Sequence, residues 1–324
     1  MESEIHGNHI VHASPEGVLA LETPLTELRK SAITPTEQVF VYSPHDVPKV
    51  SELLDGHLGV IGQVHFPVLL EVSKIRPDHH LEMVLQCFGN GQGLTETEGI
   101  PWQRGGVANV QFSGMWLRDL VNPDWVLPTA THLIARGHGP DLYEKSIPLE
   151  VAWETAFLAT HMNEKYLPRI HGGPLRLIVP GYFSEASLPW LSTLYFSDQP
   201  SPNNEGVQAM PIKSIIWEPL DKSRVTSPVR ISGAAWNGGS GPIERIELSL
   251  DHGKTWHLAQ REDAEVEPSL YAWTRWHLDV DLPFGRHEVW SRASDHASTQ
   301  PSRLDVSGSW NAIDTITFEV FYGE

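Results

Sequence analysis

The stretch LQCFGNGQG (Leu85–Gly93) joins a predicted strand to a glycine-rich turn, and it contains Cys87, the only cysteine among 324 residues. Three interpretations are open for this thiol. A free cysteine is often a buried small hydrophobe. The glycines could instead bind phosphate, although they form neither a GxGxxG motif nor a P-loop with its lysine. The third interpretation is a thiolate ligand to a soft metal, presented at the tip of a strand.

The composition restricts the possible functions. The formal net charge is −18, from 23 basic and 41 acidic side chains, which disfavours binding to nucleic acid or anionic lipid. No apolar run is long enough to span a bilayer and no leader pattern is visible. We therefore expect no membrane partner and a cytoplasmic location, or a periplasmic one if a leader was removed. A single cysteine excludes an internal disulfide, a CxxC redox pair and a four-cysteine zinc site.

The length is typical of two domains, and the sequence pattern changes along the chain. Residues 1–206, which we assign to a first domain, mix helical and strand patterns in an α+β order without regular βαβ alternation. The predicted strands are Val39–Ser43, Leu58–Val72, Leu81–Cys87 and Leu175–Gly181. The predicted helices are Ser113–Val121 and Ser146–Glu154, the second with Ser146 as a possible cap and Pro148 in its first turn.

Residues 207–324 have strand patterns almost throughout. A polar connection, SDQPSPNNEGVQAMP (Ser197–Pro211), leads into them. Ile243–Leu250 alternates apolar and polar side chains and runs into the turn sequence DHGK at Asp251–Lys254, which predicts a β-hairpin. Further strands are expected at Trp276–Leu282, His287–Ala293 and Thr317–Tyr322. This pattern favours an immunoglobulin-like β-sandwich.

Six collinear segments resemble the sulfite oxidase family of molybdenum-cofactor enzymes. LQCFGNG is similar to that family's ECxGNxR pattern at the cysteine, the glycine and the asparagine. The other similar segments are Gly105–Val121, Tyr143–Ala152, His171–Leu191, Ile231–Trp256 and the end motifs at Arg292–Asp295, Gln300–Pro301 and Trp310–Asn311. The resemblance implies a molybdopterin-binding domain followed by an immunoglobulin-like dimerisation domain, without a haem domain.

The resemblance also implies roles for individual residues. Cys87 would supply the protein thiolate to molybdenum, beside the dithiolene of molybdopterin. His65 falls where the family has a histidine that contacts the pterin. His171 and Arg176 match its cofactor-binding histidine and arginine, and a guanidinium suits a phosphate group. Ser187 and Leu188 fall on a stretch expected to contact the cofactor through the backbone.

Several family positions differ in this sequence. The two arginines that line the family's oxyanion pocket are replaced by Gln63 and Gln92, which become candidate catalytic residues. The family's pocket tyrosine has no counterpart, Pro189 replaces a lysine, and His138 falls near an aspartate position. A neutral donor forfeits about half the strength of a charge-assisted hydrogen bond, so we expect weaker binding of sulfite.

The resemblance implies a molybdenum-dependent oxidoreductase that oxidises sulfite to sulfate by two electrons at an oxo-molybdenum centre. It further implies a homodimer and an external electron acceptor, either a cytochrome c-like protein or another carrier. Two alternatives stay open. One is a related molybdenum enzyme, an oxidase or a reductase, that acts on another sulfur or nitrogen oxide. The replacement of arginines by Gln63 and Gln92 favours this alternative. The other is a non-catalytic scaffold that kept the fold.

Overall fold

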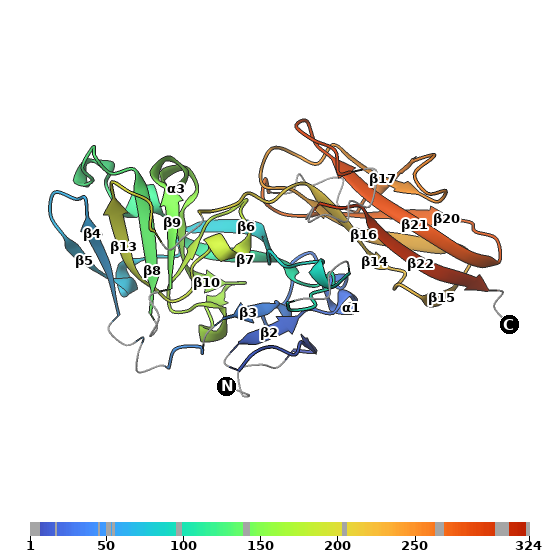
Figure 1. Ribbon diagram of the computed structural model, residues 1–324, viewed down its shortest axis with the longest axis horizontal. Coiled ribbons are helices and arrows are strands. Elements are labelled where there is room, and N and C mark those ends of the chain that lie inside the picture. The colour runs from blue at the N-terminus through green and yellow to red at the C-terminus, as the bar shows by residue number, and fades with distance from the viewer. Residues whose placement is uncertain are drawn as a thin grey trace.

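The computed structural model describes residues 7–16, 18–44, 46–49, 53, 56–94, 99–138, 143–202, 206–262, 269–301 and 311–321. An N-terminal part of mixed strands and short helices lies next to a C-terminal β-sandwich along the longest axis of the molecule (Figure 1). This architecture confirms the predicted fold class, α+β followed by a β-sandwich.

The described N-terminal part contains three sheets. The smallest consists of β1 (Ile10–Val11), β2 (Leu19–Glu22) and β3 (Val41–Ser43). The second has the order β11 (Lys165–Tyr166), β10 (Phe157–Met162), β7 (Val107–Trp116), β6 (His79–Gln86), and β12 (Arg176–Ile178) also pairs with β10. The third has the order β5 (Val68–Glu71), β4 (His57–Gly62), β13 (Leu191–Ser197), β8 (His132–Gly137), β9 (Glu144–Pro148).

Two short helices help to cover the apolar face of the third sheet. They are α2 (Leu117–Leu120) and α3 (Leu149–Thr155), which contact each other, while α1 (Leu25–Leu28) contacts the sandwich. Leu117 and Ala152 from these helices share one fully buried cluster with Leu133 of β8, Leu158 of β10 and Leu177 of β12. None of the helices in the described parts of the chain combines the length and the hydropathy that crossing a membrane requires.

The C-terminal part is a sandwich of two sheets. One has the order β14 (Lys213–Glu218), β16 (Val229–Trp236), β20 (Thr274–Val280), β19 (Gln260–Arg261). The other has the order β15 (Ser223–Thr226), β22 (Asp314–Phe321), β21 (Gly285–Ser294), β17 (Arg245–Ser249), β18 (His257–Leu258). Alternate side chains of both sheets, such as Ile231, Leu248, Trp276 and Phe318, are at most 2% exposed and form its core.

The predicted hairpin after residue 243 is confirmed, because β17 pairs with β18. His252 and Gly253 in the connecting turn have φ of 61° and 81°, the left-handed conformations that a tight hairpin turn requires. The motif residue Trp310 lies outside the described residues.

A fourth apolar cluster joins the two parts of the molecule. It combines Val84 of β6 and Val107 of β7 with Ile215, Trp217 and Trp236 of the sandwich, all of them at most 1% exposed. Burial of aromatic and branched side chains is the main source of stabilisation between packed elements. The sandwich therefore rests directly on the strand that leads to Cys87.

Three predicted elements differ from the structure. The run Leu58–Val72 is two antiparallel strands, β4 and β5, because the chain turns after Gly62, whose φ is 94°. The first residues of Ser113–Val121 continue β7 and pair with β10, so only Leu117–Leu120 is helical. Ser146 is not a helix cap: it lies in β9, its hydroxyl accepts the N–H of Ser201, and Pro148 precedes α3.

Candidate functional site

Cys87 lies directly after β6, at a corner fixed by backbone hydrogen bonds. Its N–H donates to the carbonyl of Gly106 at 2.8 Å, and its own carbonyl accepts the N–H of Asn90 at 3.0 Å. The Asn90 side chain closes the corner, since Oδ1 accepts the N–H of Gly106 at 3.0 Å. Gly91 then turns the chain with φ of 95°, a conformation that favours glycine. The glycine-rich sequence after Cys87 thus forms a rigid turn that presents a thiol 3% exposed.

A carboxyl group faces the thiol. Glu185 lies in a short 3-10 helix (Ser184–Ala186), and its Oε1 accepts the N–H of Phe88 at 2.9 Å and lies 3.6 Å from Cys87 Sγ. Its other oxygen, Oε2, is buried and has no hydrogen-bond partner. Burial and the neighbouring carboxylate together raise the pKa of the Cys87 thiol well above its ordinary value, and burial also raises the pKa of Glu185.

The carboxyl group belongs to the wall of a pocket beside the Cys87 corner. Described residues from five segments of the chain contribute to this wall: β3 with its flanking residues, Leu85 of β6, the region after β8, the segment that leads into β12 and the segment before β13. The polar residues among them are Tyr42, Ser43, Asp46, His138, Tyr143, His171, Arg176, Ser184, Glu185 and Ser187. The sequence therefore brings widely separated segments together at the thiol.

His171 and Arg176 adjoin each other in this wall. The Arg176 guanidinium donates to the carbonyls of His171 at 2.9 Å and Ser187 at 3.2 Å, while its buried Nε has no partner. His171 Nε2 lies 3.0 Å from the carbonyl of Thr36, which fixes the ring as a donor at that nitrogen. Burial, followed by the charge of Arg176, lowers the pKa of His171 to about 4. Burial lowers the pKa of Arg176 to about 10, so it stays a cation at neutral pH.

The two neighbouring predictions, Ser187 and Leu188, have different surroundings. Ser187 lines the pocket, and its carbonyl and hydroxyl are occupied by Arg176 and by the N–H of Val179. Leu188 is fully buried in the core, and its carbonyl accepts the N–H of Leu177. The backbone contact with a cofactor that was expected of these two residues stays a prediction.

Gln63 and His65 lie elsewhere, which corrects their expected position. Gln63 donates its N–H to the carbonyl of Phe196 at 2.7 Å, near the end of β13. The pocket lies at the beginning of β13, and a strand rises ~3.3 Å per residue, so the two sites are roughly 16 Å apart. The Gln63 side chain accepts from Thr129 at 2.9 Å, and His65 is exposed next to Trp125. The reason is that both residues lie in the turn between β4 and β5, and this turn is at the opposite end of β13 from the pocket.

Gln92 is close to Cys87 in the chain but is not among the described residues that line the pocket. A β-carbon added at Gly89 or Gly99 would lie within 3.4 Å of its side-chain amide, so the amide packs over the backbone of its own loop. Its expected role in receiving an oxyanion stays a prediction.

Sequence reasoning missed three pocket residues. Tyr42 lies in the segment Val39–Ser43, which was predicted as a strand but received no role. Tyr143 and Glu185 lie inside segments that resemble the sulfite oxidase family, at positions to which that resemblance assigns no role. Burial, followed by Glu185, raises the pKa of Tyr143 to about 12, so its hydroxyl is a donor throughout the neutral range. The missing signal was spatial, because only the fold joins these segments.

The donor set determines what the site can hold. No group of three or more His, Cys, Asp or Glu side chains that could hold a metal ion occurs among the described residues. A metal at Cys87 would thus need further ligands from a bound molecule. The Nε of Arg176, which has no hydrogen-bond partner, suits an anionic group on such a molecule. The described residues therefore fit a soft metal carried by an organic, phosphate-bearing cofactor.

Comparisons with known proteins agree with this chemistry. The model "Oxidoreductase molybdopterin binding domain" matches residues 45–205, and "Mo-co oxidoreductase dimerisation domain" matches residues 204–321. The mitochondrial sulfite oxidases of Drosophila melanogaster and Homo sapiens are both 29% identical, over 88% and 90% of this chain and 58% and 61% of their own lengths. The chain thus spans less than two thirds of these relatives. The crystal structure of the sulfane dehydrogenase SoxCD from Paracoccus pantotrophus matches with a TM-score of 0.80 at 25% identity, covering 99% of this chain and 92% of that one.

Proposed function

This chain belongs to the sulfite oxidase family of molybdenum-cofactor oxidoreductases, and from that premise we propose that it holds molybdenum through the thiolate of Cys87. The observation that carries this proposal is the corner itself: one thiol, 3% exposed and fixed by backbone hydrogen bonds, beside a pocket that contains His171 and Arg176. A soft thiolate is a suitable ligand for this metal, and the donor set leaves the remaining positions to molybdopterin.

The cofactor would be held by the wall of the pocket. Arg176 offers its free Nε to a phosphate oxygen, and His171, neutral at pH 7, is fixed by its hydrogen bond to Thr36. When bound, the cofactor supplies a metal centre that accepts two electrons from the substrate. The protein's part is to orient the thiolate through the corner at Gly106 and to exclude water from it by burial.

The substrate we propose first is a small sulfur compound such as sulfite, oxidised by two electrons. A second candidate class, a sulfur or nitrogen oxide with less negative charge, is favoured by one specific observation. Among the described residues that line the pocket, Arg176 is the only lysine or arginine, and it already binds two carbonyls, whereas Glu185 and Asp46 add carboxyl groups. An anion is therefore held less well here than in a pocket with free guanidiniums.

The electrons would pass to an external acceptor, a cytochrome c-like protein or another carrier. We propose that two chains associate through the C-terminal sandwich, as the description of the matching dimerisation model implies. The net charge of −18 favours an acceptor with a basic contact surface, because charge complementarity accelerates encounter.

The test is the molybdenum content per chain of protein made in a host that synthesises molybdopterin, measured by plasma mass spectrometry. We expect about one molybdenum per chain in the unchanged protein and in His65→Gln, and a background level in Cys87→Ser. Sulfite-dependent reduction of ferricyanide should be lost in the same variant. Equal molybdenum in the Cys87→Ser protein would contradict the proposal, and loss of molybdenum in His65→Gln would restore the role that the sequence gave to His65.

A further inference from the structure

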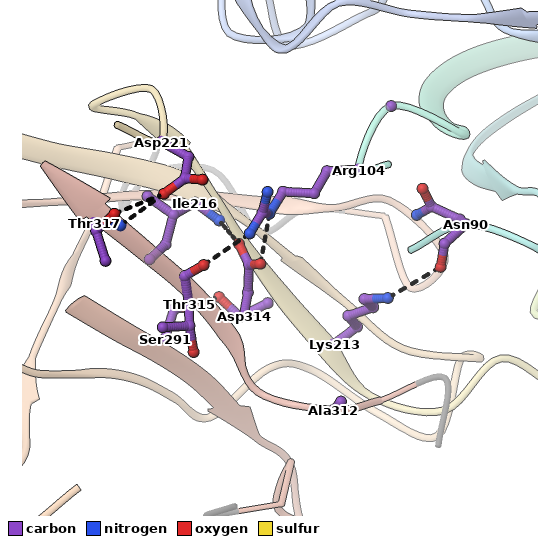
Figure 2. Close-up of polar contacts among 12 residues, drawn as sticks. Asn90, Arg104, Lys213, Ile216, Asp221, Ser291, Ala312, Asp314, Thr315 and Thr317 are labelled. Carbon is purple, nitrogen blue, oxygen red and sulfur yellow. Dashed lines mark hydrogen bonds and ion pairs between the residues drawn. The ribbon is translucent and has the colours of Figure 1, made fainter. Parts of the chain in front are cut away.

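The sandwich contacts the chain on both sides of Cys87. Before the cysteine, the Trp236 indole N–H donates to Gln86 Oε1 at 2.8 Å, and both side chains are at most 1% exposed. After it, the Lys213 ammonium donates to the carbonyl of Asn90 at 3.5 Å, a long contact that Figure 2 shows. None of these four residues is among the described residues that line the pocket.

Trp236 and Lys213 belong to one rigid unit. They are directly opposite each other on the paired strands β14 and β16. Cross-strand neighbours on a sheet hold a fixed separation, so the two donors act on the corner as a pair rather than as independent side chains. The same strands carry Ile215 and Trp217 of the apolar cluster that seats the sandwich on β6 and β7.

The burial of Lys213 at this position is energetically unfavourable. It is 8% exposed, and burial lowers the pKa of its ammonium to about 8. Asp314, whose charge partly opposes this lowering of the pKa, already accepts Arg104 Nε through Oδ1 and the N–H of Ile216 through Oδ2. Burying a cation without its own carboxylate costs stability, so the lysine is not explained by the packing of the sandwich alone. The one described hydrogen bond of its ammonium is to the turn that follows Cys87.

We propose that the Lys213–Trp236 pair of the sandwich positions Cys87, so that the dimerisation module also sets the direction of the metal-binding thiol. Trp236 fixes Gln86 and Lys213 fixes Asn90, which leaves Cys87 between two points tied to the same sheet. The importance of this positioning for the metal rests on the proposed role of Cys87. The positioning itself is a property of the protein without cofactor and can be measured there.

The experiment uses the full chain prepared without molybdenum. The variants are Lys213→Met, which removes the ammonium but keeps the length, and Trp236→Phe, which removes the N–H but keeps an aromatic ring. Two controls each remove a hydrogen-bond donor whose described bond stays within the sandwich, and Trp217→Phe keeps an aromatic ring in the apolar cluster shared with the N-terminal part. Trp217→Phe removes an indole N–H that bonds to Ser232 within the sandwich, and Arg230→Met removes an exposed cation paired with Asp279.

Two local quantities are measured: the rate at which iodoacetamide alkylates Cys87, and hydrogen exchange of the amides at residues 88–94. Losing a buried hydrogen bond increases local opening by roughly tenfold. We expect such an increase in both variants, with unchanged exchange in β4 and β13 and less than a twofold change in the controls. Because Met replaces a buried cation, the midpoint of global unfolding should not fall in Lys213→Met, which separates positioning from general destabilisation.

Unchanged alkylation and exchange in both variants would overturn the proposal, as would equal increases in the controls. If Lys213→Met does not fold, Lys213→Gln, which retains a polar end but is too short for Asn90, carries the same expectation. A molybdenum-loaded preparation adds a separate readout, a shift of the thiolate-to-metal absorption band in Lys213→Met. Failure of the molybdenum assignment would leave the alkylation and exchange results standing, so the two proposals fail separately.

Discussion

Replacing Arg104 by methionine tests whether the contact between the two parts of the chain depends on a buried ion pair. The Arg104 and Asp314 side chains are only 10% and 5% exposed, and Nε lies 2.6 Å from Oδ1. The guanidinium also donates to the carbonyl of Thr315 at 2.8 Å (Figure 2). Arg104 lies two residues before Gly106, whose carbonyl accepts the N–H of Cys87, so the pair connects that corner to β22.

The expected cost is about 3 kcal/mol. Removing one partner of a buried pair costs ~3–5 kcal/mol, because the remaining charge loses its compensation. We take the lower end of this range, since Asp314 keeps the N–H of Ile216 at 2.7 Å. The measurement is urea unfolding followed by tryptophan fluorescence, with the free energy taken from the midpoint and slope. Arg104→Met combined with Asp314→Asn should recover part of the loss, because the uncompensated charge is removed.

The exposed pair Arg230–Asp279 is the control for this prediction. Both side chains are more than half exposed, at 56% and 53%, so water screens the charges and Arg230→Met should leave the unfolding midpoint unchanged. A loss below about 1 kcal/mol in Arg104→Met would refute the reasoning, because it would mean that water already solvates this pair. Failure of the double variant to recover any stability would show that packing, and not charge, explains the effect.

Two further predictions concern the pocket. The folded-state pKa of His171 is about 4, below its ordinary 6.5, so the free energy of unfolding should fall by about 3 kcal/mol as the pH drops from 6.5 to 4. In His171→Gln this part of the stability–pH curve, measured by urea unfolding, should be flatter. In the loaded enzyme, Glu185→Gln should lower the KM for sulfite severalfold with a smaller change in kcat, because it removes a carboxylate beside the thiol. The control is Glu71→Gln on β5. An unchanged KM in Glu185→Gln would mean that Glu185 does not face the substrate.

Local sequence patterns predicted the secondary-structure elements whose conformation depends on residues close to them in the chain. The strand before Cys87 was predictable because its apolar run ends in glycines, and the β17–β18 hairpin because its turn requires left-handed residues. Ser113–Val121 was predicted as helix because its apolar residues have a helical spacing. Pairing of Met115 and Trp116 with β10 overrides that preference, since a strand's conformation is decided by its partner.

The site was predictable only where a short motif carries the contact. Cys87, His171 and Arg176 each lie in a segment whose own sequence identifies it, and the structure brings them to one corner and its adjoining pocket. Gln63 and His65 were misplaced because the short motif around them is nonspecific, and a hairpin moves it away from the pocket. Tyr42 could not be singled out, because its proximity to Cys87 and Glu185 depends on tertiary contacts between distant segments.

The contacts between the sandwich and the N-terminal part limit how far these two parts of the chain can act independently. The cluster that joins them contains Trp217, Trp236 and Trp273, and each ring buries a large apolar area at one side of β6. If the sandwich were only a dimerisation module, its contacts with the N-terminal part would need to hold the two together but not to reach the residues around Cys87. Instead, two of its hydrogen bonds end on Gln86 and Asn90, which lie on either side of the thiol in the chain. A change at the sandwich surface, including the association of two chains, would therefore be transmitted to the corner through β14 and β16, because packed sheets move as units rather than by local deformation.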